Sequence, residues 1–132
     1  MITAVDTNIL LDLFLPDPAH GANSMKSLET AYEQGALVIC GAVYAELAPQ
    51  FEDRNLLDSS LDKMGIEVIP INNEASYLAG RTWLQYRKKN KSRDRIITDF
   101  LIGSFAKFQA DRFLTRDRGF YRKYFEGLNI LY

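Results

Sequence analysis

The sequence predicts an α/β fold in which a central, mainly parallel five-stranded sheet is covered by helices on both faces. Short apolar segments alternate along the chain with longer segments of helical periodicity. The short segments are mainly apolar instead of alternating polar with apolar residues, which is typical of parallel strands that are buried on both faces. The chain has 132 residues, the length of one compact domain. We therefore expect a single α/β domain over residues 1–132.

Five apolar runs define the expected strands. They cover residues 2–5, 37–40, 66–71, 112–115 and 128–131. Helices are expected at about 9–14, 25–34, 42–48, 53–64, 74–89, 97–108 and 120–125. The first helix has Asp6 or Thr7 as its N-cap and ends before Pro16, whose ring cannot continue it. Asp94 is expected to cap the helix that begins near residue 97.

The two parts of the chain differ strongly in charge. Residues 1–80 hold 3 Lys/Arg against 12 Asp/Glu, a net charge of −9, and residues 81–132 hold 13 against 5, a net charge of +8. One part suits cations and the other polyanions, although both can simply be solvated faces. The single Cys40 excludes an internal disulfide, and its apolar strand favours a core position. With neither a secretory signal nor a membrane-length apolar run, we expect a soluble, cytoplasmic protein without membrane association.

Acidic residues follow the expected strands at the points where ligands bind in parallel sheets. Asp6 and Asp117 come directly after the first and fourth strands, and Glu46 lies one turn into the helix that leaves the second. The carboxyl ends of parallel strands share one edge of the sheet, so these three residues can lie together. Asp99 lies near the start of a helix that enters a strand, and the sequence leaves its placement open.

Each acid also has an ordinary structural interpretation. Asp6 can be only an N-cap, Glu46 a solvated helix residue and Asp117 a turn residue, while Asp99 can pair with Arg95 four residues earlier. Several carboxylates in one pocket repel each other and lose hydration, so their pKa values rise unless a cation is present. Oxygen ligands of this kind suit Mg²⁺ or Mn²⁺. Taken together, the acids favour a divalent metal site.

Four motifs in order resemble those of the PIN-domain ribonucleases, and in particular the VapC-type toxins of prokaryotic toxin–antitoxin pairs. The motifs are Asp6-Thr7-Asn8, Ala45-Glu46-Leu47, the segment ITDFLIG at 97–103 and the segment TRDRGF at 115–120. The resemblance covers nearly the whole chain. It implies a PIN-like three-layer α/β/α domain and Mg²⁺- or Mn²⁺-dependent endoribonuclease activity with one or two ions.

The resemblance also implies roles for single residues. The acidic quartet of the family falls on Asp6, Glu46, Asp99 and Asp117, and Asn8 and Thr115 match the polar residues that support the acids. Asp6 and Asp99 are the expected direct metal ligands, with the other two as ligands or holders of metal-bound water. Gly119 stands where some relatives have a further acid, which puts a complete second metal site in doubt. An antitoxin partner and a homodimer are implied as well.

Basic residues near the quartet predict RNA binding. The expected phosphate contacts are Lys88, Lys89, Lys91, Arg93, Arg116 and Arg118. Trp83 and Tyr86 can stack bases if they are exposed, but their helical spacing is more typical of core residues.

Other functions fit the sequence less well. A haloacid-dehalogenase-type phosphatase needs a second Asp where this chain has Asn8, and a receiver domain needs an Asp after the third strand, where Asn72 and Asn73 stand. The only histidine, His20, lies in a proline-rich loop, which excludes catalysis by two histidines. A catalytically inactive PIN-fold module that binds RNA or regulates remains the alternative.

Overall fold

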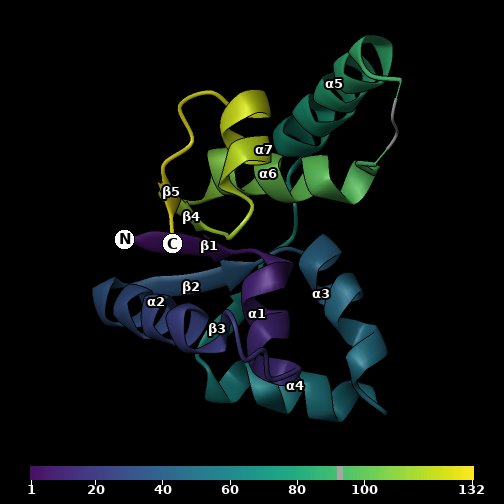
Figure 1. Cartoon of the computed structure of the whole chain (residues 1–132). Coiled ribbons are helices and arrows are strands. Elements are labelled where there is room, and N and C mark those ends of the chain that lie inside the picture. Colours follow the sequence, from purple (N-terminus) through teal and green to yellow (C-terminus); the bar gives the residue numbers. More distant parts are fainter. Residues whose placement is uncertain (92–93) are drawn as a thin grey trace.

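A five-stranded parallel sheet forms the centre of the computed structural model, which describes residues 1–91 and 94–132 (Figure 1). The strands are β1 (Ile2–Val5), β2 (Ala36–Ile39), β3 (Ile66–Val68), β4 (Arg112–Leu114) and β5 (Ile130–Leu131). Their order across the sheet is β3-β2-β1-β4-β5, and every neighbouring pair is parallel. The predicted parallel α/β fold is confirmed.

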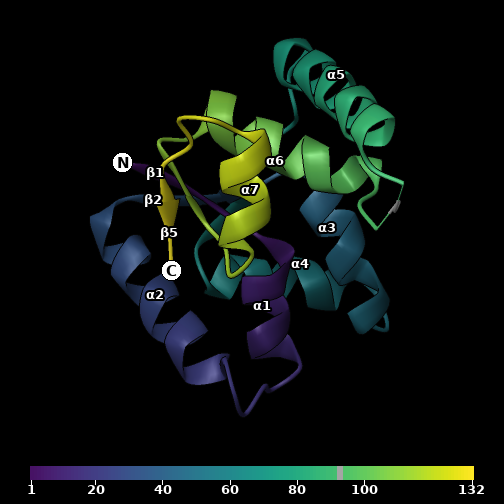
Figure 2. The same cartoon turned by 45° about the horizontal axis from the view of Figure 1, so that its top comes forward.

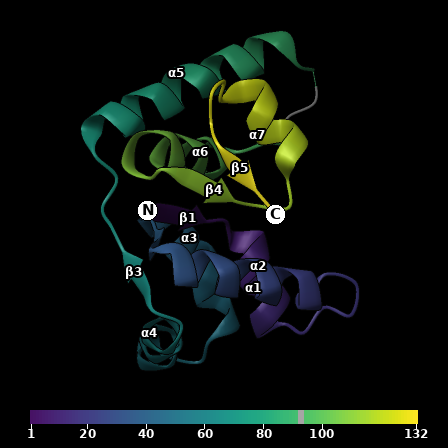
Figure 3. The same cartoon turned by 90° about the vertical axis from the view of Figure 1, so that its left-hand side faces the viewer.

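Helices cover both faces of the sheet and complete three layers (Figures 1 and 3). One face carries α1 (Thr7–Phe14), α2 (Gly21–Gln34), α3 (Gly41–Leu47), the short 3₁₀ turn η1 (Ala48–Gln50) and α4 (Arg54–Lys63). The other carries α5 (Asn73–Lys89), α6 (Ile97–Gln109) and α7 (Arg118–Tyr124). Helix α5 packs on α6 and lies farthest from the sheet. No helix within the described ranges is long and apolar enough to span a membrane.

The central strands form the core and the edge strands are short. Apart from its first residue, β1 is buried, as are the last three residues of β2 and all of β4. The expected third strand ends at Val68 rather than at residue 71, because Pro70 has no N–H for the ladder and β3 lies at an edge with Val68 exposed. Cys40 is fully buried beside the end of β2, as expected.

Helix starts follow the predicted caps with one exception. The Asp6 carboxylate accepts the Thr7 N–H at the start of α1. Asp94 does not cap α6: the cap position is Ile96, and its N–H donates to the Asp99 carboxylate at 3.0 Å. An acid at the third helical position reaches back to the cap residue, so a cap at Asp94 is unnecessary.

Aromatic side chains join the helices of the α5–α7 layer. Tyr86 is buried against Phe100 and Tyr124, with ring centroids 5.5 and 5.6 Å apart, so it is a core residue. Trp83 is partly buried, and the Arg87 guanidinium lies 4.7 Å from its ring. Gly103 lets α6 pack closely against Phe125, the residue that follows α7, because an added Cβ at Gly103 would lie 2.4 Å from the Phe125 ring.

Candidate functional site

The four acidic residues come from elements that meet at the carboxyl edge of the sheet. The Asp6 N–H continues the ladder to the Leu114 carbonyl at 2.9 Å, so the ends of β1 and β4 stand side by side. Helix α1 begins at this point, and α3 contacts both α1 and α6. Figure 2 shows α7 on the other side of the same edge. The topology therefore brings residues 6, 46, 99 and 117 to one end of the molecule.

Asp6 is the most buried of the four acids, with 5% of its surface exposed. Its Oδ1 accepts the Thr7 N–H at 2.7 Å, and its Oδ2 accepts the Thr115 hydroxyl at 2.6 Å and the Asn8 amide at 3.2 Å. Burial raises the pKa of Asp6 to about 6, the hydrogen bonds from Thr115 and Thr7 oppose this rise, and the charges of Glu46 and Asp117 add to it. Asp6 is thus held in place by neutral donors in a negative environment.

The Glu46 carboxylate is joined to the start of α1 through Thr7. The Thr7 hydroxyl donates to Glu46 Oε1 at 2.6 Å, while the Thr7 backbone binds Asp6. One threonine therefore fixes two acids from different helices. The sequence did not identify this role, although Thr7 stands inside the first motif.

Asn8 and Thr115 make hydrogen bonds to the acids and to the loop after β4. The Thr115 side-chain oxygen accepts the Asp117 N–H at 3.0 Å and donates its own proton to Asp6. The Asn8 Oδ1 accepts the Arg116 N–H at 3.3 Å. These bonds tie the loop after β4 to the first turn of α1.

Asp99 and Asp117 lie on either side of Arg95. The Arg95 guanidinium makes a short ion pair with Asp117 Oδ2, and its Nη1 lies 4.0 Å from Asp99 Oδ1. Burial raises the pKa of Asp99; the bond from the Ile96 N–H and the charge of Arg95 oppose the rise, and the charge of Asp117 adds to it. The sequence indicated the pairing of Arg95 with Asp99, but not its stronger bond to Asp117.

Tyr121 is a buried neighbour of the site that had no signal in the sequence. Its ring packs edge-on against Phe113, with the centroids 4.8 Å apart. Burial raises the pKa of the Tyr121 phenol, and the charges of Asp6, Asp99 and Asp117 raise it further. The phenol therefore stays protonated beside the acids, where it can act only as a neutral group.

The predicted RNA contacts have different surroundings. Lys88, Lys89, Lys91 and Arg118 are exposed. Arg93 lies outside the described residues. Arg116 turns away from the acids: its Nε and Nη2 bind the two oxygens of Asp12 at 2.7 and 2.9 Å, and Ser24 donates to the same carboxylate at 2.6 Å.

The donor set at the acidic edge fits a hard divalent cation in its chemistry. The four candidate ligands offer only carboxylate oxygens, which suit Mg²⁺ or Mn²⁺. In the part of the chain that the structure describes, no three acidic, histidine or cysteine side chains stand close enough to hold an ion as they are. Asp117 is drawn toward Arg95 and Glu46 toward Thr7. A shared ion thus requires these side chains to leave their present partners.

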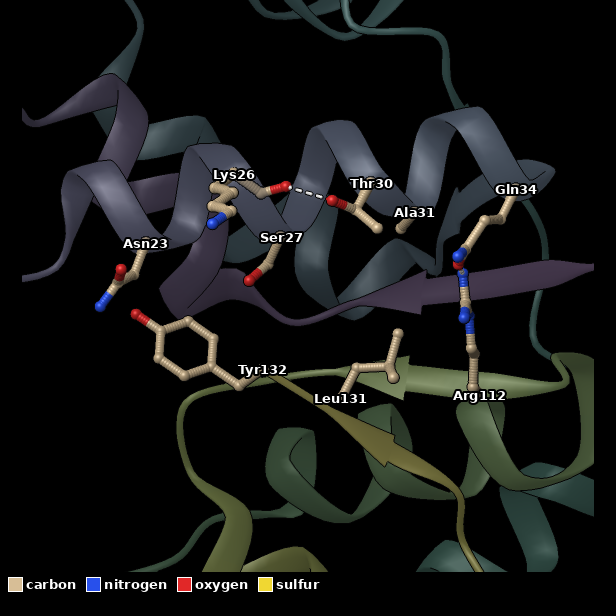
Figure 4. A pocket seen from close by; sticks show the side chains of 9 residues that line it. All are labelled: Asn23, Lys26, Ser27, Thr30, Ala31, Gln34, Arg112, Leu131 and Tyr132. Atoms are coloured by element: carbon tan, nitrogen blue, oxygen red, sulfur yellow. Dashed lines mark hydrogen bonds between the residues drawn. The ribbon is translucent and has the colours of Figure 1, made fainter.

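Two hollows lie away from the acids. A cavity of about 490 Å³ with a mixed polar and apolar lining runs between α2 and the end of β5, with Lys26 and Arg112 among its lining residues (Figure 4). A more apolar groove of about 470 Å³ lies between α2 and α4. It is lined by Met25, Leu28, Glu29, Tyr32, Glu33, Leu37, Lys63 and Met64.

Comparison with known proteins gives the family. The family model for the PIN domain matches residues 3–126, so the chain belongs to the PIN-domain family, a family of nucleases. A comparison with curated protein sequences finds no significant match.

Solved structures share the fold. VapBC2 from Rickettsia felis, bound to a DNA fragment from its promoter, matches with a TM-score of 0.72 and 21% identity over 99% of this chain and 98% of that one. VapBC-1 from nontypeable Haemophilus influenzae gives 0.71 and 21% over 99% and 97%. A toxin–antitoxin complex from Klebsiella pneumoniae gives 0.58 and 19% over 98% and 96%. At these identities the likeness establishes the fold.

Proposed function

We propose that this protein is a metal-dependent endoribonuclease that hydrolyses RNA phosphodiester bonds, and that it is a VapC-type toxin. The observation that carries the proposal is the meeting of Asp6, Glu46, Asp99 and Asp117 at the carboxyl edge of a PIN-domain sheet. The proposed unit is a single PIN domain over residues 1–132 that acts in the cytoplasm.

Asp6 and Asp99 are the proposed direct ligands of Mg²⁺ or Mn²⁺, and Glu46 and Asp117 are ligands or bind metal-bound water. One or two ions are proposed, and Gly119 adds no further acid for a second. A bound ion lowers the pKa of its water and neutralises charge on the phosphate. The chain supplies the positioning: Thr7, Asn8 and Thr115 orient the carboxylates through their hydrogen bonds.

The proposed RNA contacts are the exposed cations near this edge. Lys88, Lys89 and Lys91 end α5 and the turn after it, and Arg118 begins α7 beside Asp117. Arg93 belongs to the same basic segment, and Arg116 can contribute its charge while paired with Asp12. Lys and Arg neutralise phosphates without reading bases, so these residues give affinity and position rather than sequence preference.

An antitoxin is the proposed protein partner, together with a homodimer. Solved relatives of this fold are toxin–antitoxin complexes, which supports the partner as a class. The apolar groove between α2 and α4 exposes Met25 and Tyr32 and is suited to the apolar face of an amphipathic helix. An adjoining reading frame that encodes a small DNA-binding protein would support this part of the proposal.

Cleavage of RNA by the purified protein tests the proposal. We expect cleavage with Mn²⁺ or Mg²⁺, none with a chelator, and none for Asp99→Asn, which loses a charged oxygen ligand. Asp62→Asn makes the same change at an exposed residue of α4 and should cleave normally. Products should carry 5′-phosphates. Folded protein that binds RNA but never cuts it, whatever the metal, would point instead to the inactive RNA-binding module.

A further inference from the structure

We propose that Arg95 is a built-in counter-cation of the acidic edge, which competes with the divalent ion for Asp117. The proposal rests on the proposed metal site and concerns how that site is filled. The acids fit a hard cation, yet Asp117 is turned toward Arg95 and away from a shared arrangement with the others. The guanidinium therefore stands where a metal would otherwise neutralise this carboxylate.

Arg95 is held in this place by several contacts. Its guanidinium lies 4.2 Å from the centre of the Phe120 ring, a cation–π contact, and its backbone N–H donates to the Tyr86 hydroxyl at 3.2 Å. About a third of its side chain is exposed, 31%, so water screens the ion pair only in part. Fixed anchors at both the backbone and the side chain make this a built contact rather than a mobile surface pair.

The geometry makes the competition direct. The Arg95 Nη1 hydrogen-bonds Asp117 Oδ2 and lies 4.0 Å from Asp99 Oδ1, so one positive charge serves both acids. A guanidinium stays charged at all accessible pH values. A divalent ion at these oxygens would repel Arg95 and would compete with it for the Asp117 carboxylate. Metal binding thus includes the cost of breaking this pair, and the affinity is lower than the carboxylates alone would give.

The pair also neutralises part of the negative charge of the acidic edge. The negative charges of Glu46 and Asp117 act on Asp6, and that of Asp117 also acts on Asp99. Arg95 removes one charge from this set without filling the whole site. Release of Arg95 on metal binding would leave its guanidinium beside the edge at which RNA is proposed to bind.

Titration with Mn²⁺ alone, followed by calorimetry on the full chain, tests the proposal. Arg95→Gln should bind Mn²⁺ more tightly by about tenfold or more, since a full charge within 4 Å of two ligands is removed. Arg95→Lys, which keeps the charge but loses the fork, should lie between this variant and the wild type. Arg122→Gln removes an exposed cation of α7 and is the matched control, with an affinity within about twofold of wild type.

The outcomes separate this inference from the proposed function. If wild type and Arg95→Gln bind Mn²⁺ equally well, or the variant binds more weakly, Arg95 does not compete and the metal site stands alone. If neither binds Mn²⁺, both proposals fail. If Arg95→Gln does not fold, NMR of the wild type tests the inference instead. The Nε–Hε signal of Arg95 should shift as Mg²⁺ is added, while that of Arg122 should not change. An unmoved Arg95 signal, with the Asp6 amide responding to Mg²⁺, overturns the inference.

Discussion

Two buried aspartates of the first helix region, Asp6 and Asp12, have opposite electrostatic surroundings. Both are about 95% buried, with exposures of 5% and 4%. Asp12 accepts two hydrogen bonds from Arg116 and one from Ser24. Burial alone would raise its pKa, but these bonds and the Arg116 charge outweigh it and lower the pKa of Asp12. Asp6 has only neutral donors, and its pKa rises to about 6.

The difference is the one expected between a structural carboxylate and the proposed metal ligand. Burying a charge is costly unless a partner neutralises it. Asp12 is paired with Arg116, which lies in the loop after β4. Asp6 accepts a hydrogen bond from the neighbouring Thr115, which carries no charge. Perturbed groups of this kind are concentrated at functional sites. These surroundings are consistent with the proposed role of Asp6 as a ligand of an external cation.

The two aspartates should respond to pH in opposite directions. The folded protein binds the Asp6 proton more tightly than the unfolded chain, so this stability is present below about pH 3.8 and is lost as the pH rises through about 6. The loss amounts to about 3 kcal/mol, two pKa units. Asp12 has a lowered pKa, so its stability is present at neutral pH and is lost as the pH falls through its folded pKa.

Urea unfolding with chelator at several pH values measures this. Between about pH 4 and pH 7, Asp6→Asn should lose less stability than wild type, because its side chain does not ionise. If the free energy of unfolding changes with pH in the same way for both proteins, the pKa of Asp6 is not raised. Asp6 and Asp12 then do not differ in the way described above.

Removing the charge at Asp12 should unfold the protein more easily. Asp12→Asn leaves the Arg116 guanidinium, which is 27% exposed, without its counter-charge. Breaking a buried pair costs several kcal/mol, and partial exposure lowers this to about 2 kcal/mol. For a chain of this size the midpoint of thermal unfolding falls by roughly 8 °C. An unchanged midpoint would show that the Arg116 pair is dispensable and that Arg116 is available to RNA.

The basic segment gives the smallest expected effect. Replacing Lys88, Lys89 and Lys91 with Gln should weaken RNA binding across sequences and lower the salt slope by about 0.7 for each phosphate that is no longer neutralised. Replacing Lys26 and Lys63, which lie on α2 and α4, is the control and should leave the slope unchanged. Filter binding in a chelator, which prevents cleavage, gives both slopes. If the triple Gln variant has the same salt slope as wild type, the three lysines do not contact RNA phosphates and the segment is a solvated loop.

Much of the fold followed from local sequence rules. The short, mostly apolar strand segments predicted the parallel sheet correctly, and the cap at Asp6 predicted the start of α1. The third strand was predicted too long, because an edge position and a proline shorten the ladder in a way that hydrophobicity does not record. The Asp94 cap was wrong because Asp99 performs that function from inside the helix.

The site was less accessible to sequence reasoning. Asp6 and Asp117 could be placed from strand ends alone, but Asp99 depends on how α6 crosses the sheet, which is a tertiary property. Arg95 and Thr7 bind acids that are 22 and 39 residues away along the chain. Tyr121 is one aromatic residue among several on α7, and only burial beside the acids distinguishes it.

Thermal melts of wild type and Asp6→Asn, each with chelator and with excess Mn²⁺, test the central claim that Asp6 is buried for a metal. With chelator, Asp6→Asn should be as stable as wild type or more so: its Oδ1 can keep the Thr7 bond, and the loss of charge relieves the repulsion from Glu46 and Asp117. With Mn²⁺ at about 100 times its Kd, wild type should gain about 2.7 kcal/mol and the variant much less, which reverses the order. If Asp6→Asn is instead less stable by more than about 1 kcal/mol without metal, the value of an N-cap, and both proteins gain equally from Mn²⁺, Asp6 is a helix cap and the account is wrong.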